Sequence, residues 1–405
     1  MTWSETSWRP EAEGPLSGIR VLDLSRLVAG NMTSLQMADF GADVIKVEPI
    51  PAGDPLRAWK QAGVSSFWKV YGRNKRSLGL DFRDDGAAAV LRRLISHSDV
   101  LIENFRPGTL EKMSLGPKEL FSAHPDLILL RVSGFGQSGP YSKRPGFGTL
   151  IEAMSGFAAR NGESDGGPLL PPLALADMIA GLYGANAVSM ALRARDAGLG
   201  GQVIDLSLLE AMTSVLGPEA FDQSLTGAPK QRVGNGSNTS SPRNAYQTRD
   251  GAWIAVSGSM QSMAERLFRA IGREDMIDDP RFRTNVDRVA HREDVDAAVS
   301  AWFAERDRDE AMEAMDEAGV TAAPIYNSAD IAGDPHFRDR GIYVAAPDPE
   351  TGQSIQHSPL PRMSATPGSL RRPAPAIGEQ GPEILSELGY SNDDIARLRS
   401  AGTIA

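Results

Sequence analysis

Short apolar runs alternate with amphipathic stretches along the first half of the chain. The runs with strand character cover residues 18–24, 43–49, 74–82, 99–105 and 127–133, and another follows the glycine-rich turn at 198–201. Between them, Val90, Leu91, Leu94 and Ile95 recur at helical spacing on one stripe. Apolar strands that alternate with amphipathic helices are typical of crossover units. We therefore predict an α/β fold with a mostly parallel sheet.

Four loops follow the predicted strands and are candidates for ligand binding. They carry SRLVAG (25–30), KVEP (46–49), ENFRPG (103–108) and SGFGQSG (133–139). Ligands of open parallel sheets bind beyond the carboxyl ends of the strands, and those ends share one edge. We expect these loops to converge there.

The pattern changes after a polar stretch rich in glycine, serine and asparagine at 232–244. Residues 244–257 have hairpin character with a turn at Arg249-Asp250-Gly251, and helical patterns follow in 260–272 and 291–318. These features predict a smaller α+β domain over 225–330.

Composition excludes several classes of function. The 405 residues carry a net charge of −10, which argues against binding to a nucleic acid backbone. The chain has no cysteine and five scattered histidines, so we expect no disulfide and no zinc site. The first residues show neither a basic region nor an apolar one, and we expect a cytoplasmic protein that does not associate with membranes.

Asp177 is the only charged residue between Pro168 and Leu192. Pro171 and Pro172 interrupt this apolar stretch, which favours a buried helix over a membrane span. One interpretation makes Asp177 the N-cap of a helix that starts nearby. The other makes it a nucleophile, because a poorly hydrated carboxylate attacks carbonyl carbon more readily than a hydrated one. The stretch alone leaves both open.

Residues 134–139 match the pattern GxGxxG after a predicted strand. A dinucleotide-binding site needs a helix to begin within the pattern, whereas Pro140 and Pro145 hold this segment extended. A loop whose backbone approaches a different ligand, with Gly136 in it, accounts better for the glycines. Lys75 and Arg106, at two other strand ends, are either solvated charges or contacts for phosphate.

Several blocks occur together in a recognisable order. They are GIRVLDLSRLVAG, FGADVIKVEP, NKRSLGLDF, VLIENFRPGTLEKM, VSGFGQSGPYSKRPG, LADMIAGLYGA and GGQVIDLSLLEAM. Their order and spacing resemble the class III CoA-transferases, the family of formyl-CoA transferase and carnitine CoA-transferase, which also includes α-methylacyl-CoA racemase. The resemblance covers residues 16–400.

The resemblance implies a fold, an assembly and a reaction. The fold is a Rossmann-like large domain built from both chain ends, here 1–224 and 331–405, with 225–330 as the small domain. Two chains interlock like links to form a homodimer. Asp177, in the LADMIAG block, is implied as the nucleophile that carries first an acyl group and then CoA. A CoA thioester is the co-substrate, and no tightly bound cofactor or metal is implied.

The resemblance also assigns CoA contacts by position. Leu27, Val28 and Ala29 lie near the pantetheine or adenine, Lys75 and Arg106 face the phosphates, and Asn104, Phe105 and Met113 line the channel. Arg26 stands where formyl-CoA transferase has a histidine. The loop 233–241 occupies the place of a glycine-rich lid but lacks the run of glycines.

One departure separates two chemistries. Racemases of the family pair a histidine and an aspartate as acid and base, the histidine lying in a GHD block, where this chain has Gly146-Phe147-Gly148. Without that imidazole, racemisation loses one of its two proton carriers. We therefore expect a transferase, with an acyl-CoA racemase or a non-catalytic CoA-binding subunit of a hetero-oligomer as alternatives. Arg144 and Arg243 are candidates for a second carboxylate of the acceptor, which favours a dicarboxylate such as succinate or malate and succinyl-CoA as donor.

Overall fold

The computed structural model describes residues 3–405, and the chain forms two compact units. The larger unit contains the chain up to Ser155, Pro171–Leu216 and Pro335–Ala405, and the smaller contains Gly156–Leu170 and Gly217–Asp334. The smaller unit thus begins before the expected residue 225, and it takes in a segment, 156–170, that the sequence had grouped with the large domain.

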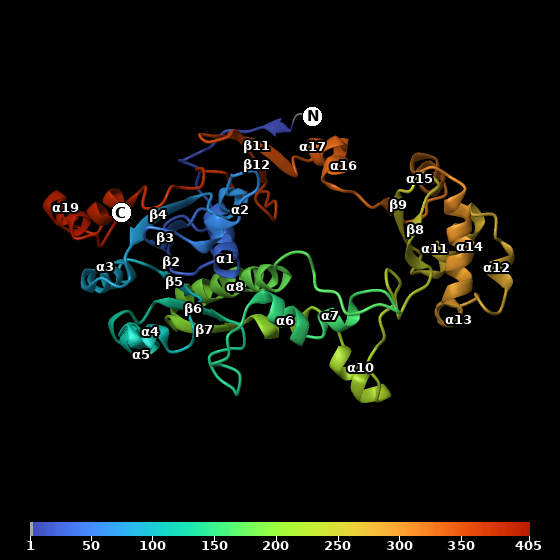
Figure 1. Cartoon of the computed structure of the whole chain (residues 1–405), viewed down its shortest axis with the longest axis horizontal. Coiled ribbons are helices and arrows are strands. Elements are labelled where there is room, and N and C mark those ends of the chain that lie inside the picture. The colour runs from blue at the N-terminus through green and yellow to red at the C-terminus, as the bar shows by residue number, and fades with distance from the viewer. Residues whose placement is uncertain (1–2) are drawn as a thin grey trace. The chain divides into compact units, whose positions relative to one another are not determined.

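A six-stranded parallel sheet forms the centre of the larger unit (Figure 1). Its order is β4-β3-β2-β5-β6-β7. The strands are β2 (Arg20–Asp23), β3 (Asp43–Pro49), β4 (Lys75–Leu80), β5 (Val100–Glu103), β6 (Ile128–Ser133) and β7 (Gln202–Ser207). The chain leaves β2 towards β3 and returns on its other side as β5, so the direction of winding reverses between β2 and β5. Such a switch point is where parallel sheets bind ligands.

Helices cover the sheet and connect its strands. They are α1 (Ala29–Asp39), α2 (Ser66–Tyr71), α3 (Asp85–Ile95), α4 (Thr109–Lys112), α5 (Pro117–Ala123), α6 (Gly148–Met154), α8 (Leu175–Ala194) and α9 (Leu208–Ser214). The runs 43–49 and 127–133 are apolar because β3 and β6 are buried almost throughout.

The C-terminal segment completes the core of the larger unit. It forms α17 (Pro335–Asp339), β11 (Tyr343–Asp348), β12 (Gly352–His357), α18 (Gly381–Glu387) and α19 (Asn392–Ser400), and β11 also pairs with β1 (Ser4–Glu5). Leu385 and Ile395 are buried with Leu91 of α3 in one apolar cluster. Arg76 of β4 bonds Glu387 of α18 at 2.6 Å, which fixes that helix to the sheet.

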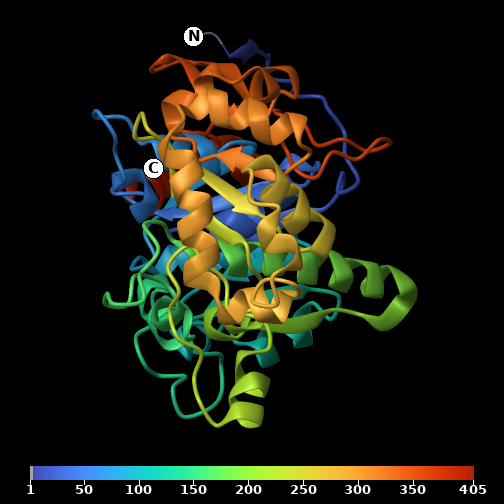
Figure 2. The same cartoon turned by 90° about the vertical axis from the view of Figure 1, so that its right-hand side faces the viewer.

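The smaller unit is built around a three-stranded antiparallel sheet, β10-β9-β8. Its elements are α7 (Phe157–Arg160), α10 (Glu219–Thr226), β8 (Arg243–Gln247), β9 (Trp253–Ser257), α11 (Gln261–Ala270), α12 (Asp275–Asp278), α13 (Asn285–Ala290), α14 (Arg292–Ala304), α15 (Arg308–Glu317), β10 (Ala322–Pro324) and α16 (Ser328–Gly333). Helices cover the sheet (Figure 2), and Tyr246 of β8 stacks on Phe303 of α14. The predicted hairpin over 244–257 is therefore present as β8 and β9.

Helices α1 and α8 pack closely because α8 has glycines where they meet. A Cβ on Gly181 would lie 2.5 Å from Met32 Cβ, and one on Gly184 would lie 2.6 Å from Thr33 Oγ1. The Thr33 hydroxyl instead donates to the Gly181 carbonyl at 3.0 Å. This contact holds the N-terminal half of α8 against the N-terminal half of α1.

Among residues 3–405, one helical stretch, Leu175–Leu199, is long and apolar enough to span a membrane by composition. It carries little weight as a membrane signal, because core helices have the same composition and α8 packs on α1 and β6 here.

Candidate active site

A cavity of about 340 Å³ lies beyond the carboxyl ends of β2, β5 and β6. The loops that follow these three strands line it together with the start of α8. The lining includes Arg26, Leu27, Ala29, Asn104, Phe105, Arg106, Gly134, Phe135, Arg144, Phe147 and Asp177. Three of the four predicted loops therefore meet at this edge of the sheet, at the switch point.

Asp177 is the third residue of α8, and Ala174 is the N-cap, so the interpretation of Asp177 as the cap is wrong. Its carboxylate is half-buried, and the backbone N–H groups of Ala29 and of Asp177 itself lie close enough to favour its charged form. Burial, together with the nearby Glu152 carboxylate, raises the pKa of Asp177 to about 6, and the two N–H groups limit that rise. Above pH 6 the site thus presents an ionised, poorly hydrated carboxylate, which suits a nucleophile.

Gly148 allows the chain to pass directly over this carboxylate. A Cβ at that position would lie 2.1 Å from Asp177 Oδ2, so no larger residue fits without displacement. The neighbouring Phe147 is 62% exposed and lines the cavity. Within the described part of the chain, no histidine lines the cavity. An imidazole acid or base is thus missing from the place where a racemase of this type needs one.

Several predicted contacts lie together at the cavity: Leu27, Ala29, Asn104, Phe105 and Arg106 all line it with Asp177. The Asn104 side chain binds the chain itself, because it accepts from Arg26 N–H at 2.9 Å and donates to Arg26 C=O at 2.8 Å. Its role is therefore to hold the loop after β2 against the loop after β5.

Other predicted contacts lie outside the lining. Val28 is 2% exposed and packs on Leu56 and Trp68, and Met113 packs on the apolar core cluster. Gly136 is buried in a turn, where its N–H donates to Ser133 Oγ at 3.0 Å.

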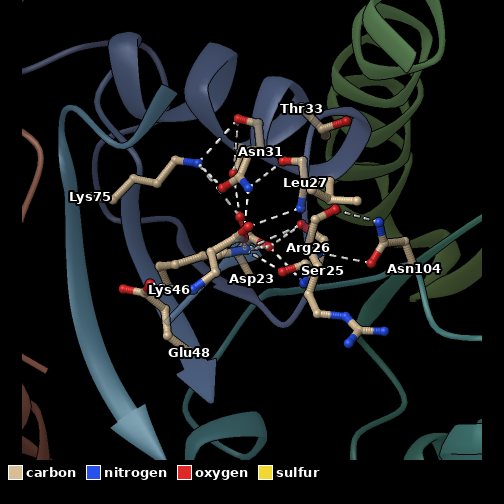
Figure 3. A network of polar contacts seen from close by, with 12 residues as sticks. Asp23, Ser25, Arg26, Leu27, Asn31, Thr33, Lys46, Glu48, Lys75 and Asn104 are labelled. Carbon is tan, nitrogen blue, oxygen red and sulfur yellow. Dashed lines mark hydrogen bonds and ion pairs between the residues drawn. The ribbon is translucent and has the colours of Figure 1, made fainter. Parts of the chain in front are cut away.

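The position of Lys75 differs most clearly from its prediction as a phosphate contact. Its side chain is fully buried, and its ammonium donates to Asn31 Oδ1 at 2.9 Å and to Asn31 C=O at 3.1 Å (Figure 3). Burial lowers the pKa of Lys75 to about 8, although the Asp23 carboxylate 3.7 Å away opposes that fall. The long side chain crosses the interior of the unit instead of reaching the cavity.

The two candidate arginines for an acceptor lie in different units. Arg144 lines the cavity with Asp177, and its guanidinium stacks on Tyr141, with 3.7 Å from guanidinium carbon to ring centre. Arg243 lies in the smaller unit beside another hollow of about 470 Å³, and it donates to the Gly236 carbonyl at 2.7 Å. The loop 233–241 belongs to that unit as well.

Sequence reasoning missed two kinds of residue. Glu152 of α6 is buried and accepts from Ala176 N–H at 3.1 Å, next to Asp177, but nothing in its sequence context marks it. Lys46 and Glu48 did carry a signal, because charged residues inside the apolar strand 43–49 need buried partners. Among the described residues, no cluster of potential metal ligands is found.

Comparison with known proteins identifies the family. The sequence model of CoA-transferase family III matches residues 16–381 of this chain. The chain is 38% identical to succinyl-CoA–D-citramalate CoA-transferase of Chloroflexus aurantiacus over 394 residues, which covers 96% of this chain and 98% of the relative. It is also 38% identical to the beta subunit of succinyl-CoA–L-malate CoA-transferase of that organism over 397 residues, with coverage of 96% and 98%.

A solved structure agrees with this assignment. The crystal structure of a CAIB/BAIF family protein from Brucella suis superposes with a TM-score of 0.82 at 33% identity, covering 93% of this chain and 100% of that one. The family model matches nearly the whole chain, and the matched residues include the cavity and its half-buried aspartate. This protein therefore belongs to CoA-transferase family III and is a CoA-transferase.

Proposed function

We propose that this enzyme moves CoA from succinyl-CoA to a dicarboxylic acid through an aspartyl-CoA thioester on Asp177. The observation that carries the proposal is the half-buried Asp177 carboxylate, which lines the cavity beside the backbone N–H of Ala29. The two relatives named above, a D-citramalate and an L-malate CoA-transferase, both use succinyl-CoA and an acceptor with two carboxylates, which supports the donor and the acceptor class.

The proposed reaction proceeds in four displacements. Asp177 attacks the thioester carbonyl, the C–S bond breaks, and CoA thiolate leaves behind a mixed anhydride. The thiolate attacks the Asp177 Cγ and expels succinate, which gives the aspartyl-CoA thioester. The acceptor carboxylate attacks the same Cγ and releases thiolate. The thiolate then attacks the acceptor acyl carbon of the new anhydride, which restores Asp177 and releases product. No proton has to move, so the cavity needs no histidine.

Backbone groups at the cavity suit the charge that develops in these steps. Each displacement at Asp177 Cγ places negative charge on an oxygen next to the Ala29 N–H, the first residue of α1. A preorganised N–H donor and the positive end of a helix both stabilise such an oxyanion. The Ala29 N–H therefore serves first the carboxylate and then the tetrahedral intermediate.

The cavity has a surplus of positive charge for anionic substrates. Arg26, Arg106 and Arg144 line it, and none forms an ion pair with an acid among residues 3–405. CoA phosphates and the carboxylates of a diacid would both be attracted. We assign the distal carboxylate of the acceptor to Arg144, because its stacking on Tyr141 holds the guanidinium in one orientation.

An acceptor panel tests this function. Turnover is measured with succinyl-CoA and matched acids that carry one or two carboxylates. Wild type should use diacids about tenfold better, because a charge-assisted hydrogen bond from the Arg144 guanidinium to the second carboxylate contributes on the order of 1.5 kcal/mol. Arg144→Met should remove that preference, while Lys143→Met, an exposed neighbour outside the cavity lining, should keep it. Equal use of both acid classes by wild type would contradict the acceptor class.

We also propose that the enzyme works as a homodimer. The packed elements α6, α8, β7 and α9 leave large apolar side chains uncovered, namely Leu150, Met154, Leu182, Tyr183, Met190, Val203 and Val215, each 41–60% exposed. Strand β7 is also an open edge of the sheet. Surfaces of this kind mark association sites. Light scattering of the purified chain should give twice 43.4 kDa. Activity that appears only with a second gene product would instead support a hetero-oligomer.

A further inference from the structure

The middle of the loop between β2 and α1 is held by side chains. Each backbone N–H and C=O of Ser25, Arg26 and Leu27 has a side-chain partner (Figure 3). The partners of the outer residue, Arg26, come from Asn104. Those of Ser25 and Leu27 come from below the loop, from Asp23, Lys46, Asp54 and Asn31. All six backbone groups of these three residues are therefore satisfied within the protein.

The side chains below the loop form a buried network of balanced charge. Lys46 and Lys75 are fully buried and lie within 3.7 Å of carboxylate oxygens of Asp23, while Lys46 also reaches Asp54 at 3.1 Å. Burial would raise the pKa of Asp23, but the two ammonium groups hold it at about 2. Two cations thus face two anions, although burial lowers the pKa of one of the cations, Lys75, to about 8.

The network stabilises a backbone shape that leucine adopts reluctantly. Leu27 has φ of 62°, in the left-handed region that side chains other than glycine disfavour. Its N–H donates to Asp54 Oδ1 at 3.0 Å, and its C=O accepts from Asn31 Nδ2 at 2.6 Å. The same Asn31 amide donates to Asp54 Oδ2 at 2.9 Å. Asn31 and Asp54 therefore hold Leu27 from both sides.

The held residue precedes the catalytic donor by two positions. The turn at Leu27 sets where α1 begins, and Ala29, the first residue of that helix, directs its N–H at Asp177. If the turn relaxes, the donor moves while Asp177 stays on α8. Backbone donors of this kind lose effect over a displacement of about 1 Å.

We propose that Asn31 is a positioning residue, which aims the Ala29 N–H at Asp177 by holding Leu27 in its left-handed turn. This inference rests on the proposed role of Asp177 as nucleophile. It goes beyond that role in assigning a catalytic purpose to a buried amide that does not touch the cavity.

The charged groups around Asp177 influence its pKa and therefore the pH dependence of kcat/KM. Glu152 faces it from α6, and Arg26, Arg106 and Arg144 line the same cavity from three loops. Asn31→Ala leaves all four unchanged. If the Ala29 N–H moves away, the charged form of Asp177 loses a stabilising donor and the pKa of Asp177 rises. The acid limb of the pH profile of kcat/KM should then move to higher pH.

The experiment compares Asn31→Ala with Ser34→Ala. Both residues lie on α1, both are fully buried, and both bond the network, but the Ser34 hydroxyl donates to Asp23 and does not touch the loop. For each variant, kcat, KM and the pH dependence of kcat/KM are measured with succinyl-CoA, together with the rate of acyl or CoA adduct formation on the Asp177 peptide by mass spectrometry.

We expect Asn31→Ala to lower kcat about tenfold and to move the acid limb upward by about one pH unit, with a smaller change in KM. Ser34→Ala should lose stability but keep the wild-type limb. Identical limbs and adduct rates in both variants would overturn the positioning role and leave the nucleophile in place, whereas absence of any Asp177 adduct in wild type would overturn both. If the alanine variant does not fold, Asn31→Ser permits the same comparison.

Discussion

Replacing the nucleophile should make the protein more stable. The folded-state pKa of Asp177 is about 6, against an ordinary value of 3.8, because the carboxylate is half-buried and faces Glu152. Folding therefore favours the protonated form. Below pH 3.8 both states carry the proton and no cost arises. As the pH rises towards 6, the unfolded chain ionises first and the free energy of unfolding falls.

The magnitude follows from the two pKa values. The difference is 6 − 3.8 = 2.2 pH units, and each unit corresponds to about 1.4 kcal/mol, so the full cost above pH 6 is about 3 kcal/mol. Asp177→Asn has a similar shape and no charge to bury. Relative to wild type, its free energy of unfolding should be higher by about 1–3 kcal/mol at pH 8, and the gain should vanish near pH 4.

Urea unfolding at fixed protein concentration over pH 4–8 measures this difference. The same exchange at Asp196, whose side chain is 65% exposed, should change the free energy of unfolding by less than about 0.5 kcal/mol at either end. Transferase activity of Asp177→Asn should be lost at every pH. A variant that is less stable than wild type at pH 8, or a gain that does not depend on pH, would refute the reasoning.

Three further outcomes are expected. Gly148→Ala should abolish turnover while the chain still folds, because the new methyl group would lie 2.1 Å from Asp177 Oδ2, and activity together with circular dichroism would show it. Asp23→Asn should lower the free energy of unfolding by about 3–5 kcal/mol in urea, because it removes the carboxylate that faces both buried lysines and leaves Asp54 to balance Lys46. Arg106→Met should raise KM for acyl-CoA and weaken its salt dependence, whereas Lys75→Met should change stability and leave that salt dependence intact.

Local sequence pattern predicted the parallel sheet because burial on both faces demands apolar strands. Residues 43–49 and 127–133 show this plainly as β3 and β6. The pattern could not place β2 between β3 and β5, since strand order depends on which helices cross over which face. The loops at the carboxyl ends were predicted for the same reason, because parallel strands bring those ends together.

The pattern of apolar and polar residues could not predict the direction in which individual side chains point. Arg106 and Lys75 both follow or begin apolar strands and both looked like phosphate contacts, yet only Arg106 lines the cavity. Lys75 is drawn inward by Asn31 and Asp23, residues 44 and 52 positions away along the chain. Contacts of such long range are properties of the fold. Asp177 became a candidate by the opposite route, because a lone charge in an apolar stretch is conspicuous in the sequence itself. Its role as nucleophile was implied by the family resemblance and stays a proposal.

The most direct measurement is the trapping of the covalent enzyme. Wild type is incubated with succinyl-CoA and no acceptor, quenched in acid, digested, and analysed for modified peptides. We expect a CoA thioester on the peptide that contains Asp177, absent from Asp177→Asn and discharged when a diacid is added before the quench. An unmodified Asp177 peptide in an enzyme that turns over, or the same adduct on Asp177→Asn, would contradict this expectation.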